Sequence, residues 1–209
     1  EVNNLVTEYI HDVSFNLRRG EVLGFAGLIG AGRTEVMRAV FGADPVSSGE
    51  IWLDGKAVSF KSPKNAIDSG IALCPEDRKE QGLILGRSIR DNISIPVLSK
   101  MKKRLFLDVK KEERLAAAAV SKYSIKTPTT EKLMVELSGG NQQKVVIAKW
   151  LVRDCDILIF DEPTRGIDVG AKAEIQRLVA ALADEGMAVM FISAELEEVL
   201  RLSHRIVVM

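Results

Sequence analysis

A glycine-rich loop at residues 27–34 constrains the fold of this chain more than any other segment. It has the sequence Gly-Leu-Ile-Gly-Ala-Gly-Arg-Thr and lies between an apolar run at residues 22–26 and a helix-forming stretch at residues 34–40. Glycines allow a backbone to wrap an anion, and the free amides at a helix start point toward it. The loop therefore predicts a strand–loop–helix unit that binds phosphate, with a plain glycine-rich turn as the alternative.

The spacing of this loop matches the phosphate-loop pattern G-x-x-x-x-G-K-[ST] everywhere except at the lysine, which is Arg33 here. A planar guanidinium is bulkier than an ammonium group, so we expect Arg33 to permit nucleotide binding but to place a γ-phosphate poorly. Thr34 keeps the hydroxyl that such loops offer to Mg²⁺. The predicted nucleotide-binding residues are Gly27, Gly30, Ala31, Gly32, Arg33, Thr34 and Glu35.

Two adjacent acids, Asp161 and Glu162, follow an apolar run at residues 155–160. Carboxylates at the end of a buried strand are costly unless something there uses them. In phosphate-loop enzymes the first acid holds Mg²⁺, and the next can orient or deprotonate the attacking water. We therefore predict Thr34 and Asp161 as Mg²⁺ ligands and Glu162 as the catalytic residue. A helix N-cap role is the alternative for the acid pair.

Apolar runs alternate with helical stretches through much of the chain. Residues 22–26, 155–160 and 188–192 have the character of buried strands, and residues 171–183 have that of a helix. Strands alternating with helices indicate an α/β fold with a mainly parallel sheet flanked by helices.

Two regions depart from this alternation. Near the start, Val13, Phe15 and Leu17 alternate with polar residues, and residues 50–53 form a second short strand, so we expect an N-terminal antiparallel β subdomain. The middle of the chain, at about residues 85–137, contains a strongly helix-forming stretch instead. We predict that it forms an inserted helical subdomain.

Length and charge exclude several classes of protein. The 209 residues suit one domain, and Lys plus Arg and Asp plus Glu each number 29, so we expect no dedicated nucleic-acid surface. No apolar run approaches the roughly 18 residues that a membrane helix needs. The two cysteines, Cys74 and Cys155, lie far apart in apolar runs, which disfavours a disulfide framework.

Residues 137–144, Leu-Ser-Gly-Gly-Asn-Gln-Gln-Lys, open a second helix. The Ser138 hydroxyl and the amides after it form another anion-binding helix start. With the phosphate loop before it and the acid pair after it, the whole chain resembles an ABC transporter ATPase cassette. In that family this signature segment closes over ATP held by the phosphate loop of another cassette. The resemblance implies that the segment acts in trans, through Ser138, Gly139, Gly140, Asn141 and Gln142.

Four segments narrow the resemblance: residues 30–35, 75–78, 138–144 and 161–170. Together they are similar to the second, C-terminal cassette of bacterial sugar-import ATPases of the ribose, xylose, galactose and arabinose type, in which two cassettes share one polypeptide. The resemblance implies a single cassette over residues 1–209 with a P-loop NTPase core that binds ATP and Mg²⁺. Its implied partners are the first cassette of the same polypeptide, the membrane permease subunits and, indirectly, a periplasmic or extracellular sugar-binding protein. It also implies a peripheral position on the cytoplasmic face of the bacterial cell membrane.

Three positions depart from the pattern of a competent cassette. Arg33 replaces the lysine, Glu76 lies about where the family places a glutamine that contacts the metal, and Ala194 lies where it places a γ-phosphate-sensing histidine. The signature segment is unaltered. We therefore expect a degenerate site in this cassette, a signature that serves the partner cassette, and slow or absent ATP hydrolysis by the isolated domain.

Competing interpretations remain at this stage. The leading hypothesis is an ATPase that couples ATP binding and hydrolysis to carbohydrate uptake. The alternative is a regulatory or structural nucleotide-binding module that does not hydrolyse ATP, favoured by Arg33 and Ala194 and opposed by the acid pair. A soluble ABC protein of DNA repair or translation is disfavoured, because no long coiled-coil insertion or basic linker is present. Tyr9, the only tyrosine before the phosphate loop, either stacks on adenine or packs in the core.

Overall fold

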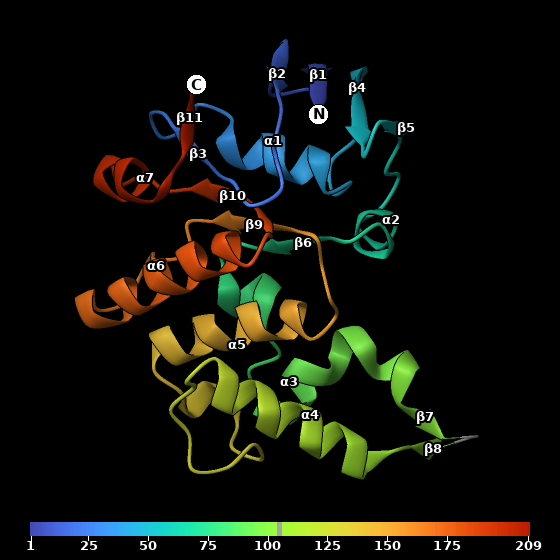
Figure 1. Ribbon diagram of the computed structural model, residues 1–209, viewed down its shortest axis with the longest axis vertical. Coiled ribbons are helices and arrows are strands. Elements are labelled where there is room, and N and C mark those ends of the chain that lie inside the picture. Colours follow the sequence, from blue (N-terminus) through green and yellow to red (C-terminus); the bar gives the residue numbers. More distant parts are fainter. Residues whose placement is uncertain (104–105) are drawn as a thin grey trace. The chain divides into compact units, whose positions relative to one another are not determined.

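The computed structural model describes residues 1–103 and 106–209, which divide into two compact units (Figure 1). The sheet unit contains residues 1–73, 155–163 and 179–209, and the helical unit contains residues 74–154 and 164–178. The predicted helical subdomain, at about residues 85–137, falls within the second of these ranges. Residues 104 and 105 of that subdomain lie outside the described residues. A single cassette with those subdomain limits stays a prediction.

The larger sheet has five strands in the order β11-β3-β10-β9-β6. β10 pairs in parallel with β3 and with β9, and β11 pairs in parallel with β3. The strands are β3 (Val22–Ala26), β6 (Ile71–Cys74), β9 (Ile157–Asp161), β10 (Ala188–Ile192) and β11 (Arg205–Val208). The prediction of an α/β fold with a mainly parallel sheet is confirmed.

A second, four-stranded sheet has the order β2-β1-β4-β5 and only antiparallel pairings. Its strands are β1 (Val2–Val6), β2 (Val13–Phe15), β4 (Ser48–Leu53) and β5 (Lys56–Val58). This sheet confirms the expected antiparallel β subdomain. A short antiparallel pair, β7 (Lys102–Lys103) with β8 (Phe106–Leu107), belongs to the helical unit.

Helices lie between these strands along the chain. In the sheet unit they are α1 (Arg33–Val40), α2 (Pro63–Asp68) and α7 (Leu196–Leu202). In the helical unit α3 (Ile89–Ser94) packs against both α4 (Val109–Lys122) and α5 (Gly139–Leu151). The remaining helix is α6 (Val169–Asp184), and short turns of other helix types are η1 (Arg78–Gly82), η2 (Ile95–Met101) and η3 (Met134–Glu136). No described helix has both the length and the apolar character needed to cross a membrane.

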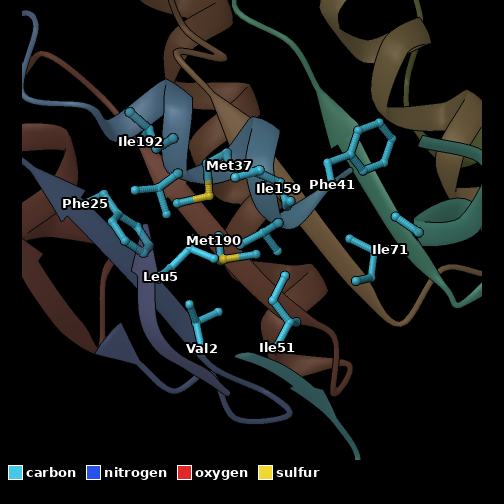
Figure 2. Close-up of a cluster of buried hydrophobic side chains, with 14 of the residues drawn as sticks. Val2, Leu5, Phe25, Met37, Phe41, Ile51, Ile71, Ile159, Met190 and Ile192 are labelled. Atoms are coloured by element: carbon cyan, nitrogen blue, oxygen red, sulfur yellow. The ribbon is translucent and has the colours of Figure 1, made fainter. Parts of the chain in front are cut away.

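The core of the sheet unit is built from β3, β9, β10 and α1 together with the inner face of the antiparallel sheet (Figure 2). All five residues of β3 are buried, as expected for a strand that has neighbours on both sides and helices on its faces. The Phe25 ring meets the Phe15 ring edge-on at a centroid distance of 5.2 Å. This packing fixes the end of β3, where the phosphate loop begins.

Two strand limits differ from the prediction, and each has a local reason. β9 begins at Ile157 rather than at Cys155, because the amides of Asp156 and Ile157 both donate to the Gly70 carbonyl before the pairing with β10 starts. β2 ends at Phe15 rather than at Leu17, because Phe15 lies opposite Val2, the first residue of β1.

Candidate functional site

The phosphate loop occupies the predicted place between β3 and α1 in the sheet unit. Gly32 is the N-cap of α1 with φ +90°, and Gly30 has φ +84°. Residues with a Cβ rarely adopt such angles, so both positions need glycine. A Cβ on Gly32 would also lie only 2.7 Å from Cγ2 of Ile10. The loop conformation therefore depends on the glycines that the spacing identified.

The outer side of this loop is open. Leu28 and Ile29 are 84% and 92% exposed, and a Cβ added to Gly30 would meet nothing within 4 Å. The N-cap glycine has no side chain that could satisfy the first amides of α1, which leaves them for an anion. Within the loop the Ala31 amide donates to the Leu28 carbonyl at 3.0 Å. Glu35 lies half-buried in the first turn, where its charge favours the helix but repels an anion.

Thr34 and Asp161 meet although 127 residues separate them in sequence. The Thr34 hydroxyl donates to Oδ1 of Asp161 at 3.1 Å. Burial is the main cause that raises the pKa of Asp161, to about 6, and the bond from Thr34 acts in the opposite direction. Burial thus disfavours the charged form of this carboxyl group, which is a situation that a bound cation would relieve.

These two residues fit a magnesium ion that arrives with a phosphate ligand. Adjacent ligands of an octahedral magnesium ion lie about 3 Å apart, and the Thr34 and Asp161 oxygens are 3.1 Å apart. The described residues contain no group of three or more His, Cys, Asp or Glu side chains that could hold a metal by themselves. Magnesium is commonly bound by one or two protein oxygens together with substrate phosphates, so two ligands suffice.

Arg33 does not extend along the open side of the loop. It is 7% exposed, and its Nη1 donates to the Ser193 carbonyl at 2.8 Å. Its Nη2 lies 3.8 Å from Oε1 of Glu162. The guanidinium thus links the phosphate loop to the acid pair and to the segment that follows β10, and its charge is partly neutralised within the protein.

Glu162 is held by its main chain and by its carboxylate. Its φ of +49° lies in the left-handed region, and its amide donates to the Ile192 carbonyl at 3.0 Å. Burial raises the pKa of Glu162, while a hydrogen bond from the Ala194 amide and the charge of Arg33 lower it. A residue with a Cβ in this conformation is uncommon and is often found at functional sites.

The segment after β10 contains Ala194, at the position expected for the γ-phosphate-sensing histidine. Ala194 is exposed, and its only polar contribution is its backbone. Next to it, the Ser193 hydroxyl donates to Glu198 at 2.7 Å and accepts from the Glu195 amide at 3.1 Å. Tyr9, upstream of the phosphate loop, is 65% exposed, so core packing is wrong for this residue and stacking stays a prediction.

The signature segment lies in the helical unit, where Ser138 is the N-cap of α5. The Ser138 hydroxyl makes no cap bond to its own helix. Instead it accepts from Nδ2 of Asn141 at 2.9 Å, and Oδ1 of Asn141 accepts from the Lys126 amide at 2.8 Å. Since Asn141 occupies a lone pair of the hydroxyl, the exposed O–H of Ser138 is left to donate outward.

Two other predicted residues lie in the helical unit with partners of their own. Glu76 forms an ion pair with Arg165. Gln142 is buried, with its amide nitrogen donating to the Met134 carbonyl at 3.1 Å. Of the predicted site, the structure brings together Arg33, Thr34, Asp161, Glu162 and the Ala194 backbone within the sheet unit. The residues predicted to act in trans, and Glu76, belong to the other unit.

Two participants were missed by sequence reasoning. The Ser193 carbonyl binds Arg33 through its backbone, and a backbone atom leaves no trace in side-chain patterns. Arg78, in the 75–78 segment that supports the family resemblance, is buried and binds the carbonyls of Arg165 and Gly166. A charged residue between Asp77 and Lys79 gave no signal that it would be buried.

Comparisons with known proteins show what this chain is similar to. The chain is 58% identical over 201 residues to an import ATP-binding protein of Burkholderia lata named for ribose, galactose and methyl galactoside, covering 96% of this chain and 39% of that protein. It is 49% identical over 209 residues to the ribose import ATP-binding protein RbsA of Oceanobacillus iheyensis, covering all of this chain and 42% of that protein. The chain therefore spans about two fifths of the length of these relatives.

Solved structures show the same fold. A nucleotide-free ATP-binding cassette from an ABC transporter superposes with a TM-score of 0.83 at 21% identity, covering 100% of this chain and 86% of that one. A post-hydrolysis dimer of an ATP-binding cassette with ADP and Pi gives a TM-score of 0.83 at 20% identity, covering 100% and 93%. Residues 10–165 match the ABC transporter family. With this match over most of its length, the chain belongs to the ABC transporter family.

Proposed function

We propose that this chain is an ATP-binding cassette of a bacterial importer that couples ATP binding and hydrolysis to the uptake of sugars such as ribose or galactose. The names of the relatives support the class of substrate. The relatives are more than twice as long as this chain, which leaves room for another cassette of its size in the same polypeptide. Together with the segments that resemble the C-terminal cassette, this supports assigning the chain to the second of two cassettes.

The same proposal places the cassette among membrane partners. It would work with the first cassette of its polypeptide and with permease subunits, on the cytoplasmic face of the membrane. A sugar-binding protein outside the membrane would act on it only through the permease. The helical unit, with Glu76 near its start, is the proposed route of coupling to the permease, since loops that respond to nucleotide move in such machines.

ATP and Mg²⁺ are the proposed ligands of the sheet-unit site. The amides around Gly27, Gly30 and Gly32 would bind the phosphates, and Thr34 with Asp161 would hold the magnesium ion. When bound, the ion would neutralise phosphate charge. The role of Asp161 in this arrangement is to present one charged oxygen beside the Thr34 hydroxyl, which its burial and its bond to Thr34 support.

Asp161→Asn is expected to lower about tenfold the ratio of the ATP affinity measured with Mg²⁺ to the ATP affinity measured without it. Asparagine keeps the shape and can still accept from Thr34, so the change removes the charge alone. The measurement is ATP titration with Mg²⁺ and with a chelator. Asp156→Asn, at an ion-paired surface position five residues earlier, should leave the ratio of the two affinities unchanged. Equal ratios in all three proteins would contradict the assignment of Asp161.

The observation that carries the rest of the proposal is the position of Arg33. Its guanidinium is buried against the Ser193 carbonyl and lies 3.8 Å from the Glu162 carboxylate. A phosphate-loop cation that is already bound by the protein has less charge to offer a γ-phosphate. Ala194 has no side chain that could sense the γ-phosphate as the family's histidine does. We infer that this cassette hydrolyses its own ATP poorly, while Ser138 and the glycines after it serve the partner's ATP.

The isolated domain is expected to hydrolyse ATP at least about a hundredfold below the ~1–100 s⁻¹ that is typical of kinases. Glu162→Gln should leave that slow rate unchanged within about twofold, because Glu162 would not be the limiting base. Turnover is measured on purified domain at saturating Mg-ATP, and ATP binding is titrated to establish that the site is loaded. A fast turnover that Glu162→Gln removes would refute a degenerate site.

A second candidate is a cassette that binds ATP without hydrolysing it at all and so acts as a regulatory or structural module. The contact between Arg33 and Glu162 favours it, because the contact occupies the carboxylate that would activate water. The two candidates differ in Arg33→Lys within the full-length protein. A gain in the ATP hydrolysed per transport cycle supports a silent site, and no change supports slow residual hydrolysis.

A further inference from the structure

Arg78 is a buried arginine that binds another loop of the helical unit. It is 9% exposed, and it is the last residue of the 75–78 segment, which follows β6. Its Nη1 donates to the Arg165 carbonyl at 2.8 Å, and its Nη2 donates to the Gly166 carbonyl at 3.2 Å. One guanidinium thus binds two successive carbonyls of the loop that connects β9 to α6. The planar fork of arginine suits this geometry, and the single ammonium of lysine does not.

A second link joins the same two segments. Arg165 forms an ion pair with Glu76, two residues before Arg78. Glu76, Asp77, Arg78, Lys79 and Arg165 line a pocket of about 450 Å³. The Arg165–Glu76 pair is largely exposed, and the Arg78 contacts are part-buried. Exposed ion pairs contribute little to stability, so the Arg78 contacts are the stronger link between the two segments.

The start of the signature helix lies against this arrangement. A Cβ added to Gly139 would lie 2.8 Å from Nη2 of Arg78 and 3.3 Å from the Gly166 carbonyl. The same atom would lie 3.3 Å from Cγ2 of Ile167. The backbone of Gly139 can approach so closely only because it has no side chain. Arg78 therefore contacts the first residue of α5, immediately after Ser138.

The burial of Arg78 has no explanation in the packing of an apolar core. Burial lowers the pKa of the guanidinium, and the neighbouring charge of Asp77 offsets this only in part. Its Nε is buried without a hydrogen-bond partner among the described residues. A buried polar group with an unmet hydrogen bond is destabilising, so its presence calls for an explanation.

We propose that Arg78 is a positioning residue that ties the 75–78 segment and residues 165–166 to the start of the signature helix, so that the three move as one body. The proposal rests on the proposed function, in which Ser138 and Gly139 act on ATP bound by the partner cassette. A displacement of Glu76 by a permease or a nucleotide would then shift Ser138 toward or away from that ATP. Arg78 touches neither the nucleotide nor the water in this arrangement.

The test uses the full-length protein assembled with its permease and compares Arg78→Met, Arg78→Lys and the parent. The turnover number is expressed per nucleotide-binding site, with the sites counted by ATP titration. Arg78→Met is expected to lower kcat about tenfold with KM for ATP within about twofold. Arg78→Lys, which keeps the charge and one hydrogen bond, should lower kcat about threefold. Arg114→Met, at an exposed position on α4, should change neither value.

The count of sites separates positioning from structural support. If Arg78 only stabilises the fold, Arg78→Met lowers the number of sites and the melting temperature, while kcat per site keeps its parental value. That result would overturn the proposal. A loss of kcat per site with a full number of sites, smaller for Arg78→Lys, would support it.

A double-mutant comparison tests the contact with the signature helix. Gly139→Ala is made in the parent and in Arg78→Met, where the guanidinium that its Cβ would meet is gone. We expect the loss of kcat caused by Gly139→Ala to be at least about threefold smaller in the Arg78→Met protein than in the parent, because residues in contact show non-additive effects. If the two substitutions lower kcat by factors that simply multiply, as they do for independent sites, the proposed link between Arg78 and the signature helix is wrong.

Failure of this inference and failure of the proposed function give different results. If Ser138→Arg leaves ATP turnover of the full-length protein unchanged, the signature does not act in trans and the proposed function is wrong. If Ser138→Arg abolishes turnover while both Arg78 variants keep kcat per site, the proposed function stands and the role of Arg78 alone is rejected.

Discussion

Gly139→Val is expected to lower ATP turnover of the full-length protein about a hundredfold, the loss typical of removing one donor from a transition-state binding site. A side chain at Gly139 would collide with Nη2 of Arg78 and with the Gly166 carbonyl. The start of α5 would then shift, and Ser138 would no longer present its hydroxyl to the partner's ATP. Arg33→Ala, in contrast, is expected to lower turnover by less than about threefold, because in the proposed function the site it alters contributes little.

The matched control for Gly139→Val is Gly86→Val in the same unit. Gly86 is exposed, and a Cβ there would meet nothing within 4 Å. Its variant should therefore keep turnover within about twofold. Equal losses from Gly139→Val and Arg33→Ala would show that both sites hydrolyse ATP, and the proposed asymmetry between the cassettes would be wrong.

The parts of the fold that sequence predicted well are those in which local and long-range forces agree. β3 consists of five apolar or small residues that are all buried, and the loop after it holds glycine at both positions with positive φ. α1 starts at Arg33, within one residue of the predicted start. Pattern, turn chemistry and helix start all favour the same strand–loop–helix unit, so a short window of sequence was enough.

Contacts between distant segments could not be obtained in the same way. The bond from Arg33 to the Ser193 carbonyl spans 160 residues, and that from Arg78 to the Arg165 carbonyl spans 87. Both acceptors are main-chain atoms, which every residue possesses. The sequence indicated that Arg33 was unusual for its loop, but the direction of its side chain follows from the arrangement of β3, β9 and β10.

The two anion-binding helix starts illustrate what this arrangement adds. At α1 the cation next to the loop is bound by the protein's own carbonyl and lies near its own carboxylate. At α5 the hydroxyl of Ser138 is exposed and is oriented by Asn141. The two helix starts thus differ in how much of their binding capacity is left for a ligand. The difference supports a cassette that offers more to its partner's nucleotide than to its own.

Leu23→Ala is expected to reduce the free energy of unfolding by about 3 kcal/mol, within the range measured for buried leucines. Leu23 is 1% exposed on β3, where it lies opposite Met190 of β10 and Arg205 of β11. The same substitution at Leu28, which is 84% exposed in the phosphate loop, should change stability by less than about 0.5 kcal/mol. Urea unfolding of the domain provides both values, provided that the slope against urea stays constant.

This pair of variants also tests whether the apolar tip of the phosphate loop is free in the domain. The two leucines are five positions apart in sequence and undergo the same change, so the difference in stability reports mainly the difference in their burial. Saturating ATP should raise the unfolding midpoint of the parent and of both variants, because a ligand that binds only the folded state stabilises it. A large loss for Leu28→Ala would mean that the loop packs against other residues in solution, and the open anion-binding face inferred from Leu28, Ile29 and Gly30 would be wrong.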